Sequence, residues 1–307
     1  MYFDHTYINI PLLGLEFNPP RLIEVFGLTI YFYGLIIAAG LMLAVTYAWK
    51  RSKQFGIKED DLTDGVIWVV PFAILCARLY YVAFKWEDYA SNPISILHIN
   101  KGGLAIYGGV IGAVLGAFIH CKVKKIKFAA LMDLVALGFL IGQSIGRWGN
   151  FFNREAYGAV TNVAWKMGLW NTSTGEYEWV HPTFLYESLW NAIGFVLLHI
   201  VSKRRKYDGQ VALGYVAWYG LGRALIEGLR SDSLYWGPFR VSQVLAAVSC
   251  FAAVVVLMVM SFKYHDPEKL FVNQVAAAAA EAEAEETEDA EEAEQAEEPA
   301  EAEETEE

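Results

Sequence analysis

Long apolar blocks alternate with short polar segments along most of this chain. Seven blocks are long enough for a helix that crosses a hydrocarbon core of about 30 Å. They cover residues 22–48, 63–84, 104–120, 129–147, 183–202, 210–229 and 241–262. The pattern predicts an all-α membrane protein with seven transmembrane helices. The first block is too long for a removable signal peptide, and the residues before it carry no positive charge cluster.

Basic residues are concentrated in every second connection between these blocks. The three basic connections hold Lys50, Arg51, Lys53 and Lys58, then Lys122, Lys124, Lys125 and Lys127, then Lys203, Arg204, Arg205 and Lys206. Short loops rich in Lys and Arg stay in the cytoplasm. We therefore expect the N-terminus outside and the C-terminus in the cytoplasm, which agrees with an odd number of spans.

The net charge changes this picture only at the C-terminal end. The chain of 307 residues has a formal charge of −11, yet residues 281–307 hold 16 Asp and Glu and no Lys or Arg. Without them the chain is mildly basic. Low-complexity Ala/Glu sequence does not bury a core. We expect a membrane body at 1–265 and an acidic tail at 266–307 that is disordered or transiently helical.

Cysteine and histidine positions carry no recognisable site. Cys76, Cys121 and Cys250 are scattered through the apolar blocks, and the six histidines lack ligand spacing. We therefore expect no disulfide, no metal site and no cofactor, and the chain has no feature that predicts a nucleic-acid partner.

The most concentrated polar segment follows the fourth apolar block. Residues 146–158 carry Arg147, Asn150, Arg154 and Glu155 among glycines and aromatic residues. A charge at membrane depth costs about 2.5–3.5 kcal/mol on insertion scales. Simple interfacial anchoring is one interpretation, but the amides and the carboxylate favour paired charges in a polar site. We expect the glycines to loosen the helix and to expose backbone N–H groups beside a cavity.

A second polar group is predicted at the same depth. Glu187 stands near the start of the fifth block, and Arg223, Glu227 and Arg230 share one helix face near the end of the sixth. Intramembrane Arg–Glu pairs normally face the bundle interior. By the predicted topology these groups lie toward the outer side, where guanidiniums suit bidentate phosphate recognition. The residues alone thus predict an anion-binding cavity, in either a phospholipid-handling enzyme or a transporter.

The third block begins with closely spaced glycines. Gly108, Gly112 and Gly116 fall four residues apart, and such faces let two helices approach closely. Tyr107 stands among these glycines, as an interfacial anchor or as a hydrogen-bond donor in a cavity.

At these residues the chain resembles the bacterial prolipoprotein diacylglyceryl transferase family over roughly residues 8–262. The matching segments are Phe32-Tyr33-Gly34, Ala77 to Tyr81, Gly102 to Gly109, Gly146 to Gly158, His181-Pro182-Thr183 with Tyr186-Glu187, Tyr219 to Arg230, and Arg240 to Gln243. The acidic tail lies outside the resemblance.

The resemblance implies an enzyme of the bacterial cytoplasmic membrane. Such an enzyme moves the diacylglyceryl unit of phosphatidylglycerol onto the lipobox cysteine of a prolipoprotein, whose signal peptide delivers the thiol, and releases glycerol phosphate. It implies catalytic roles for Arg147, Arg223, Asn150, Glu155 and Tyr107, and lipid binding by Arg147, Tyr33, Gly158, Tyr219, Glu227 and Arg230. We expect Arg147 and Arg223 to clamp the phosphate, with Glu155 and Glu227 fixing their rotamers.

One position departs from the family pattern. Many members have a histidine where this chain has Tyr107, and a tyrosine with a pKa of about 10 is a weaker base for a thiol of about 8.5. Tyr107 then orients the substrate, or the base is Glu155, Glu227 or water in a positive cavity. The competing function is a phospholipid transporter or flippase with an outer-leaflet headgroup site, and thiol alkylation separates the two.

Overall fold

The fold is that of a computed structural model, which describes residues 5–26, 28–98, 102–231, 234–263 and 266–303. Within these ranges the chain is mostly helical. The long helices are α1 (Phe32–Arg51), α2 (Glu59–Phe84), α4 (Ile106–Lys124), α5 (Phe128–Asn153), α6 (Thr183–Ser202), α7 (Gln210–Glu227), α8 (Val241–Lys263) and α9 (Phe271–Glu303).

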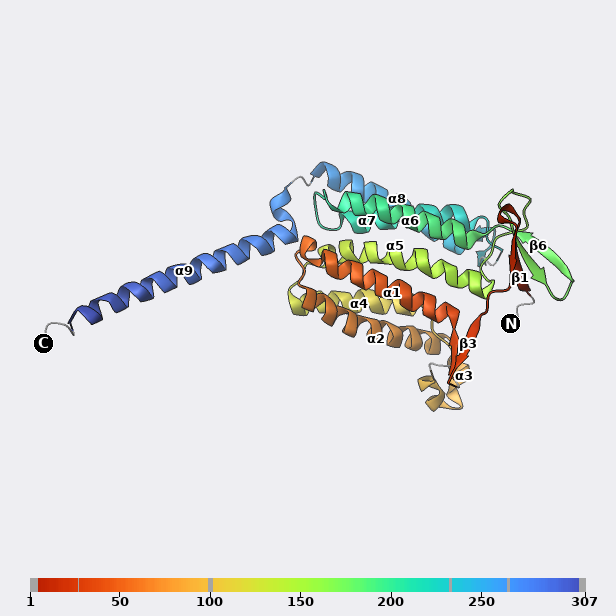
Figure 1. The fold of residues 1–307 in the computed structure, drawn as a ribbon, viewed down its shortest axis with the longest axis horizontal. Coiled ribbons are helices and arrows are strands. Elements are labelled where there is room, and N and C mark those ends of the chain that lie inside the picture. The colour runs from red at the N-terminus through yellow and green to blue at the C-terminus, as the bar shows by residue number, and fades with distance from the viewer. Residues whose placement is uncertain (1–4, 27, 99–101, 232–233, 264–265, 304–307) are drawn as a thin grey trace.

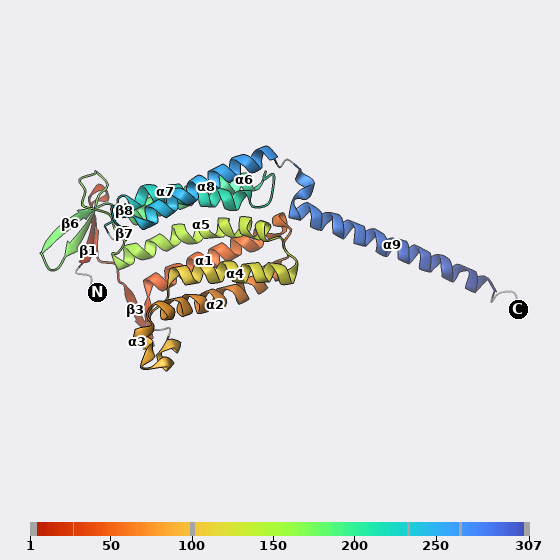
Figure 2. The same ribbon diagram turned by 180° about the vertical axis from the view of Figure 1, so that it is seen from behind.

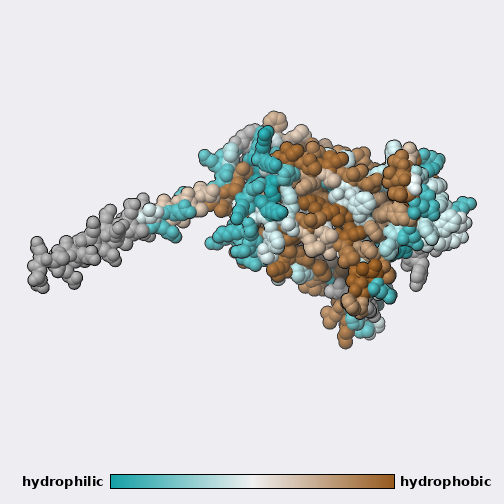
Figure 3. Space-filling model, in the orientation of Figure 1, coloured by the Kyte–Doolittle hydropathy of each residue, from teal (hydrophilic) through white to brown (hydrophobic). Residues whose placement is uncertain are grey.

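Six described helices are long and apolar enough to cross a membrane, namely α1, α2, α4, α5, α6 and α8. Helix α7 is not among them, because its 18 residues include Gln210, Arg223 and Glu227. A broad hydrophobic band covers the middle of the molecule, with hydrophilic surface at both ends (Figure 3). This distribution is that of a multi-pass membrane protein.

Helix α5 occupies the centre of the bundle. It packs against α1 on one side and against α6 and α7 on the other, while α8 packs on α7 and α2 pairs with α4 (Figures 1 and 2). The predicted close approach of the third block is confirmed. A Cβ on Gly108 would lie 2.6 Å from the carbonyl oxygen of Cys76, and one on Gly112 would lie 2.5 Å from the Cys76 Cβ.

The all-α prediction is wrong at one end of the bundle, where strands cover the ends of α5 and α6. Strands β1 (His5–Ile10), β2 (Leu15–Phe17), β5 (Met167–Asn171) and β6 (Glu176–Val180) form an antiparallel sheet in the order β2-β1-β5-β6. Ile8, Leu169 and Val180 are buried in one cluster with Phe151 of α5 and Phe184 of α6. The sheet therefore fixes the loops that join these two helices.

Shorter elements complete this end and the connections. They are the hairpins β3 (Leu22–Val25) with β4 (Leu28–Tyr31) and β7 (Tyr235–Trp236) with β8 (Phe239–Arg240), helix α3 (Trp86–Ala90), and the 3-10 helices η1 (Pro11–Leu13), η2 (Ser52–Phe55), η3 (Pro93–Leu97) and η5 (Pro267–Lys269).

Two predicted helix boundaries are corrected by these elements. Residues 22–25 and 28–31 form the strands of the β3–β4 hairpin, and the first helix begins at Phe32, not at residue 22. This stretch is rich in β-branched and aromatic residues, which suit a strand as well as a membrane helix. Helix α5 runs to Asn153, beyond the predicted end at residue 147. Its glycines at 146 and 149 do not break it.

The acidic tail leaves the bundle at the end opposite the sheet, as the single helix α9 (Figure 1). Its root is attached to the bundle. The backbone N–H of Phe271 donates to Asp208 at 2.8 Å, and Lys127 Nζ donates to the carbonyl of Lys269 at 3.1 Å. The division into a body and a tail at residue 265 remains a prediction, and residues 264–265 and 304–307 lie outside the described ranges.

Candidate active site

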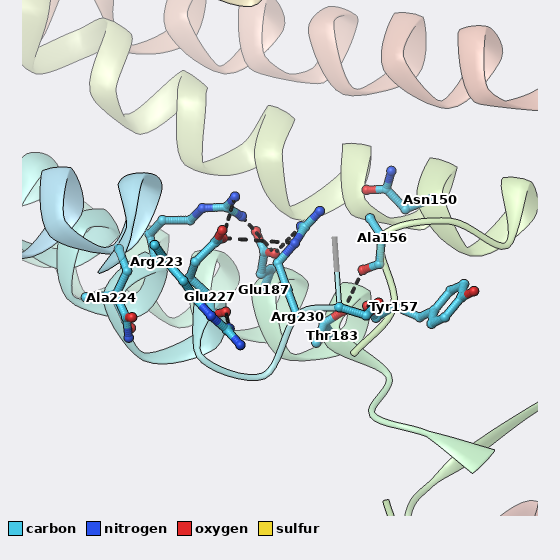
Figure 4. A network of polar contacts seen from close by, with 12 residues as sticks. Asn150, Ala156, Tyr157, Thr183, Glu187, Arg223, Ala224, Glu227 and Arg230 are labelled. Carbon is cyan, nitrogen blue, oxygen red and sulfur yellow. Dashed lines mark hydrogen bonds and ion pairs between the residues drawn. The ribbon is translucent and has the colours of Figure 1, made fainter. Parts of the chain in front are cut away.

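Three arginines from two helices and the segment after α7 meet two glutamates near the sheet end of the bundle. Figure 4 shows Glu187, Arg223, Glu227 and Arg230 of this group. Arg147 comes from α5 and Glu187 from the first turns of α6, while Arg223 and Glu227 come from the last turns of α7 and Arg230 follows that helix. We call these five residues the arginine cluster. The convergence predicted from depth and topology is confirmed for them.

Glu187 lies at the centre of the arginine cluster. Its Oε2 lies 2.6 Å from Arg147 Nη2, and its Oε1 lies 3.3 Å from both Arg223 Nη1 and Arg230 Nη1. The sequence placed Glu187 in the second polar group, but the resemblance implied no catalytic or binding role for it. Its partners could not be assigned from sequence because they lie on two other segments.

Glu227 forms the second anchor for the guanidiniums. Its Oε2 lies 2.7 Å from Arg223 Nη2 and 4.0 Å from Arg230 Nε. The predicted shared helix face is confirmed for Arg223 and Glu227, whereas Arg230 lies beyond the end of α7 and reaches Glu227 from the segment that follows. Arg240, the last residue of β8 and the residue before α8, donates a hydrogen bond to the backbone carbonyl of Glu227. Arg223 is therefore held by two carboxylates, and its expected pairing with Glu227 is confirmed.

In the arginine cluster the carboxylates are more deeply buried than the guanidiniums. The Glu187 and Glu227 side chains are 4% and 2% exposed, whereas those of Arg147 and Arg223 are 22% and 19% exposed. Three guanidiniums face two carboxylates, which leaves one positive charge in excess. Partly accessible arginines that are oriented by buried carboxylates have the geometry that suits recognition of an anion such as a phosphate.

Asn150 and Glu155 extend this network along the end of α5. Arg147 Nη1 donates to Asn150 Oδ1 at 3.3 Å, and the amide nitrogens of Asn150 and Asn153 donate to Glu155 Oε1 at 3.1 and 3.2 Å. The expected support of the Arg147 rotamer by Glu155 involves no direct ion pair between the two side chains among the described contacts. Glu187 forms the ion pair with Arg147, and Glu155 reaches Arg147 only through the Asn150 amide.

Arg154 is turned away from the arginine cluster, contrary to the predicted pairing with Glu155. Its guanidinium donates to the backbone carbonyls of Thr6 at 2.8 Å and Pro19 at 2.6 Å. Burial, with a smaller contribution from nearby Arg21, lowers the pKa of Arg154 to about 10. Arg154 therefore fastens the N-terminal segment to the end of α5.

The signature glycines permit close packing around the site. A Cβ on Gly149 would lie 2.6 Å from the ring of Tyr33, so this tyrosine of α1 rests directly on α5. Gly158 forms a bridge to Arg230, and a Cβ there would lie 2.6 Å from His181 Cβ. The predicted exposure of helix N–H groups by Gly146 and Gly149 is wrong, because both positions are helical.

The two remaining predicted residues differ in their relation to the cluster. Tyr219 stands one turn before Arg223 on α7 and lines a small recess with it. Tyr107 stands in the first turn of α4, more than half exposed. No hydrogen bond or ion pair among the described residues joins Tyr107 to the arginines.

Comparison of the sequence with known proteins identifies the family of this chain. Residues 20–259 match the model of the prolipoprotein diacylglyceryl transferase family. Among curated relatives, the phosphatidylglycerol--prolipoprotein diacylglyceryl transferase of Clostridioides difficile (strain 630) is 43% identical over 238 residues, which cover 78% of this chain and 94% of that protein. The enzymes of the same name from Clostridium novyi (strain NT) and Enterococcus faecalis (strain ATCC 700802 / V583) are 42% and 43% identical, covering 80% of this chain and 96% and 93% of theirs.

The matched region contains every residue of the arginine cluster and ends before the acidic tail. The chain therefore belongs to the prolipoprotein diacylglyceryl transferase family.

Proposed function

We propose that this protein transfers the diacylglyceryl group of phosphatidylglycerol to the lipobox cysteine of prolipoproteins. The cysteine sulfur attacks the glyceryl carbon that bears the phosphoester. The carbon–oxygen bond to the phosphate breaks, a thioether forms, and glycerol phosphate leaves. The thiol proton passes to a base. The arginine cluster is the observation that carries this proposal, beside the family membership.

The cluster matches the charge of the leaving group. Phosphatidylglycerol has a phosphodiester with one negative charge, and the ion-paired cluster has one positive charge in excess. As the carbon–oxygen bond breaks, the leaving phosphate gains charge. Guanidiniums that are already oriented stabilise such developing charge without reorganising. The same cluster therefore serves for both binding and catalysis.

Each site residue has a role in this scheme. Arg147 and Arg223 hold the phosphate, and Glu187 and Glu227 keep their guanidiniums oriented. Arg230 adds a third guanidinium, positioned through the bridge to Gly158. Asn150 supports the site by linking Arg147 to Glu155. Tyr33 packs on α5 at Gly149, and Tyr219 lines the recess beside Arg223, so both border the lipid site.

We place the proton acceptor at Glu155. Within the described contacts its carboxylate is held by the neutral amides of Asn150 and Asn153, whereas Glu187 and Glu227 are paired with arginines. A carboxylate held by guanidiniums is a poor base, because its charged form is stabilised. Tyr107 then orients the incoming peptide.

The setting of the reaction is the bacterial cytoplasmic membrane. We propose seven crossings, with α7 as the seventh, the N-terminus outside and the C-terminus inside. Helix α7 packs on both α6 and α8, and the basic connections lie at the end of the bundle opposite the sheet. Signal peptides of prolipoproteins and membrane phospholipid are the partners. The arginine cluster then faces the outer leaflet.

The reaction is tested with purified protein, phosphatidylglycerol and a synthetic lipobox peptide whose mass is read before and after incubation. We expect a mass gain of one diacylglyceryl group on the cysteine, and none for a Cys→Ser peptide or for the Arg147→Ala enzyme. Folded wild-type protein that gives no mass gain would overturn the proposal in favour of a lipid transporter with the same headgroup site.

A further inference from the structure

A small recess between α6 and α7 lies directly beside the arginine cluster. Its lining includes Glu187, Trp190, Asn191, Tyr219, Gly222 and Arg223. Glu187 and Arg223 belong to both the cluster and the recess. The recess is therefore continuous with the phosphate site and is not a separate cavity.

Asn191 is the polar group of this recess that lacks a partner. Its side chain is 2% exposed, and its Oδ1 has no hydrogen bond among the described residues. Trp190, the tryptophan of the recess lining, is satisfied, because its indole N–H donates to the backbone carbonyl of Trp218 at 2.9 Å. A buried amide without a partner is costly, so its retention points to a ligand.

The position of Asn191 indicates which part of the ligand it meets. It lies one turn after Glu187 on α6, and Tyr219 lies one turn before Arg223 on α7. Both steps lead away from the sheet end and toward the middle of the bundle, by about 6 Å along each helix. In a membrane phospholipid the group at this distance on the acyl side of the phosphate is the diacylglyceryl ester.

We infer that the amide of Asn191 donates a hydrogen bond to an ester carbonyl of the diacylglyceryl unit. An ester carbonyl accepts only, so its partner is the amide nitrogen Nδ2 of Asn191. The lipid is then held on both sides of the reacting carbon, by arginines at the phosphate and by Asn191 at the ester. This inference rests on the proposed function and adds a determinant of lipid specificity to it.

The test compares two lipids in three enzymes. Phosphatidylglycerol with ester-linked chains is compared with its ether-linked analogue of equal chain length, which lacks the carbonyls. For the wild-type enzyme we expect kcat/KM to favour the diester by about 3- to 10-fold, the size of one neutral hydrogen bond. Asn191→Leu should lose this preference, because its kcat/KM on both lipids should fall to the value that the wild-type enzyme has on the diether lipid. If the Asn191→Leu variant does not fold, the smaller substitution Asn191→Ala is used in the same comparison.

Gln143→Leu is the matched control. Gln143 is another amide inside the bundle, on α5 and outside the recess lining. Its Nε2 donates to Tyr215 at 2.8 Å, and its Oε1, like Asn191 Oδ1, has no hydrogen bond among the described residues. The Gln143→Leu variant should keep the diester preference whatever its absolute rate. A preference retained by both Asn191 variants, or no preference in the wild type, overturns the inference. Wild-type protein inactive on both lipids overturns the proposed function instead.

Discussion

Arg147 uses separate nitrogens of one planar group to contact two helices. Nη2 meets Glu187 of α6 at 2.6 Å while Nη1 donates to Asn150 at 3.3 Å. Arg223 does the same with Glu187 and Glu227. A lysine has the charge but a single nitrogen, so it cannot keep two such contacts and also face a phosphate. The planar shape of the guanidinium group is therefore needed at these two positions in addition to its positive charge.

This argument predicts that Arg147→Lys and Arg223→Lys each lower kcat/KM by about 100-fold or more, the usual loss when one preorganised donor to a developing charge is removed. The measurement is peptide lipidation at varied phosphatidylglycerol concentration. Arg51→Lys is the control, because Arg51 is buried at the opposite end of the bundle, where it contacts Ser202. Near-full activity in both site variants would contradict the clamp.

Glu155 is the residue whose role is best tested by pH. If it accepts the thiol proton, Glu155→Gln must rely on thiolate that is already free, and its rate should rise with pH up to the thiol pKa of about 8.5. The wild-type rate should level off at lower pH. We expect the variant to be slower by about 100- to 10,000-fold at pH 7, the range for loss of a general base. A slower variant with an unchanged pH profile would assign Glu155 to positioning alone.

At the scale of elements, the sequence was most informative where the pattern is local. The fifth block was predicted at 183–202 and α6 spans Thr183–Ser202. The pairing of Arg223 with Glu227 also follows from helical spacing, whereas Arg230 lies beyond the end of α7. The β3–β4 hairpin was missed because its apolar residues continue directly into α1, and hydropathy does not separate a strand from a helix in such a run. The contact of Arg147 with Glu187 depends on α5 packing against α6, which local patterns do not encode.

Packing between elements is tested at Gly158. A Cβ there would lie 2.6 Å from His181 Cβ and 2.8 Å from the carbonyl oxygen of Leu229. Gly158→Ala should push this segment from the end of α7 and displace Arg230, with a loss of stability of about 1–3 kcal/mol, typical of overpacking. Gly142→Ala on α5 is the control, because its Cβ would meet nothing within 4 Å. Thermal unfolding and lipidation of both variants check this, and equal behaviour of the two would contradict it.

At the scale of the whole molecule, polar chemistry is concentrated toward one end and basic connections toward the other. The sheet and the arginine cluster lie at the first end, and α9 leaves from the second (Figures 1 and 2). Helix α7 determines how this polarity maps onto the membrane. With α7 as a crossing, the chain has seven spans, so its N-terminus and C-terminus face opposite sides of the membrane. Without α7, six crossings would leave both termini on the same side.

Single cysteines on either side of α7 decide between these arrangements. In a background with Cys76, Cys121 and Cys250 replaced by alanine, Lys206→Cys precedes the helix and Ser231→Cys follows it. A membrane-impermeant maleimide applied to intact cells should label Ser231→Cys, and Lys206→Cys only after permeabilisation, since four basic residues hold that connection inside. Labelling of both or neither in intact cells would exclude α7 as a crossing. The reverse pattern would instead turn the arginine cluster toward the cytoplasm, away from the compartment proposed for the reaction.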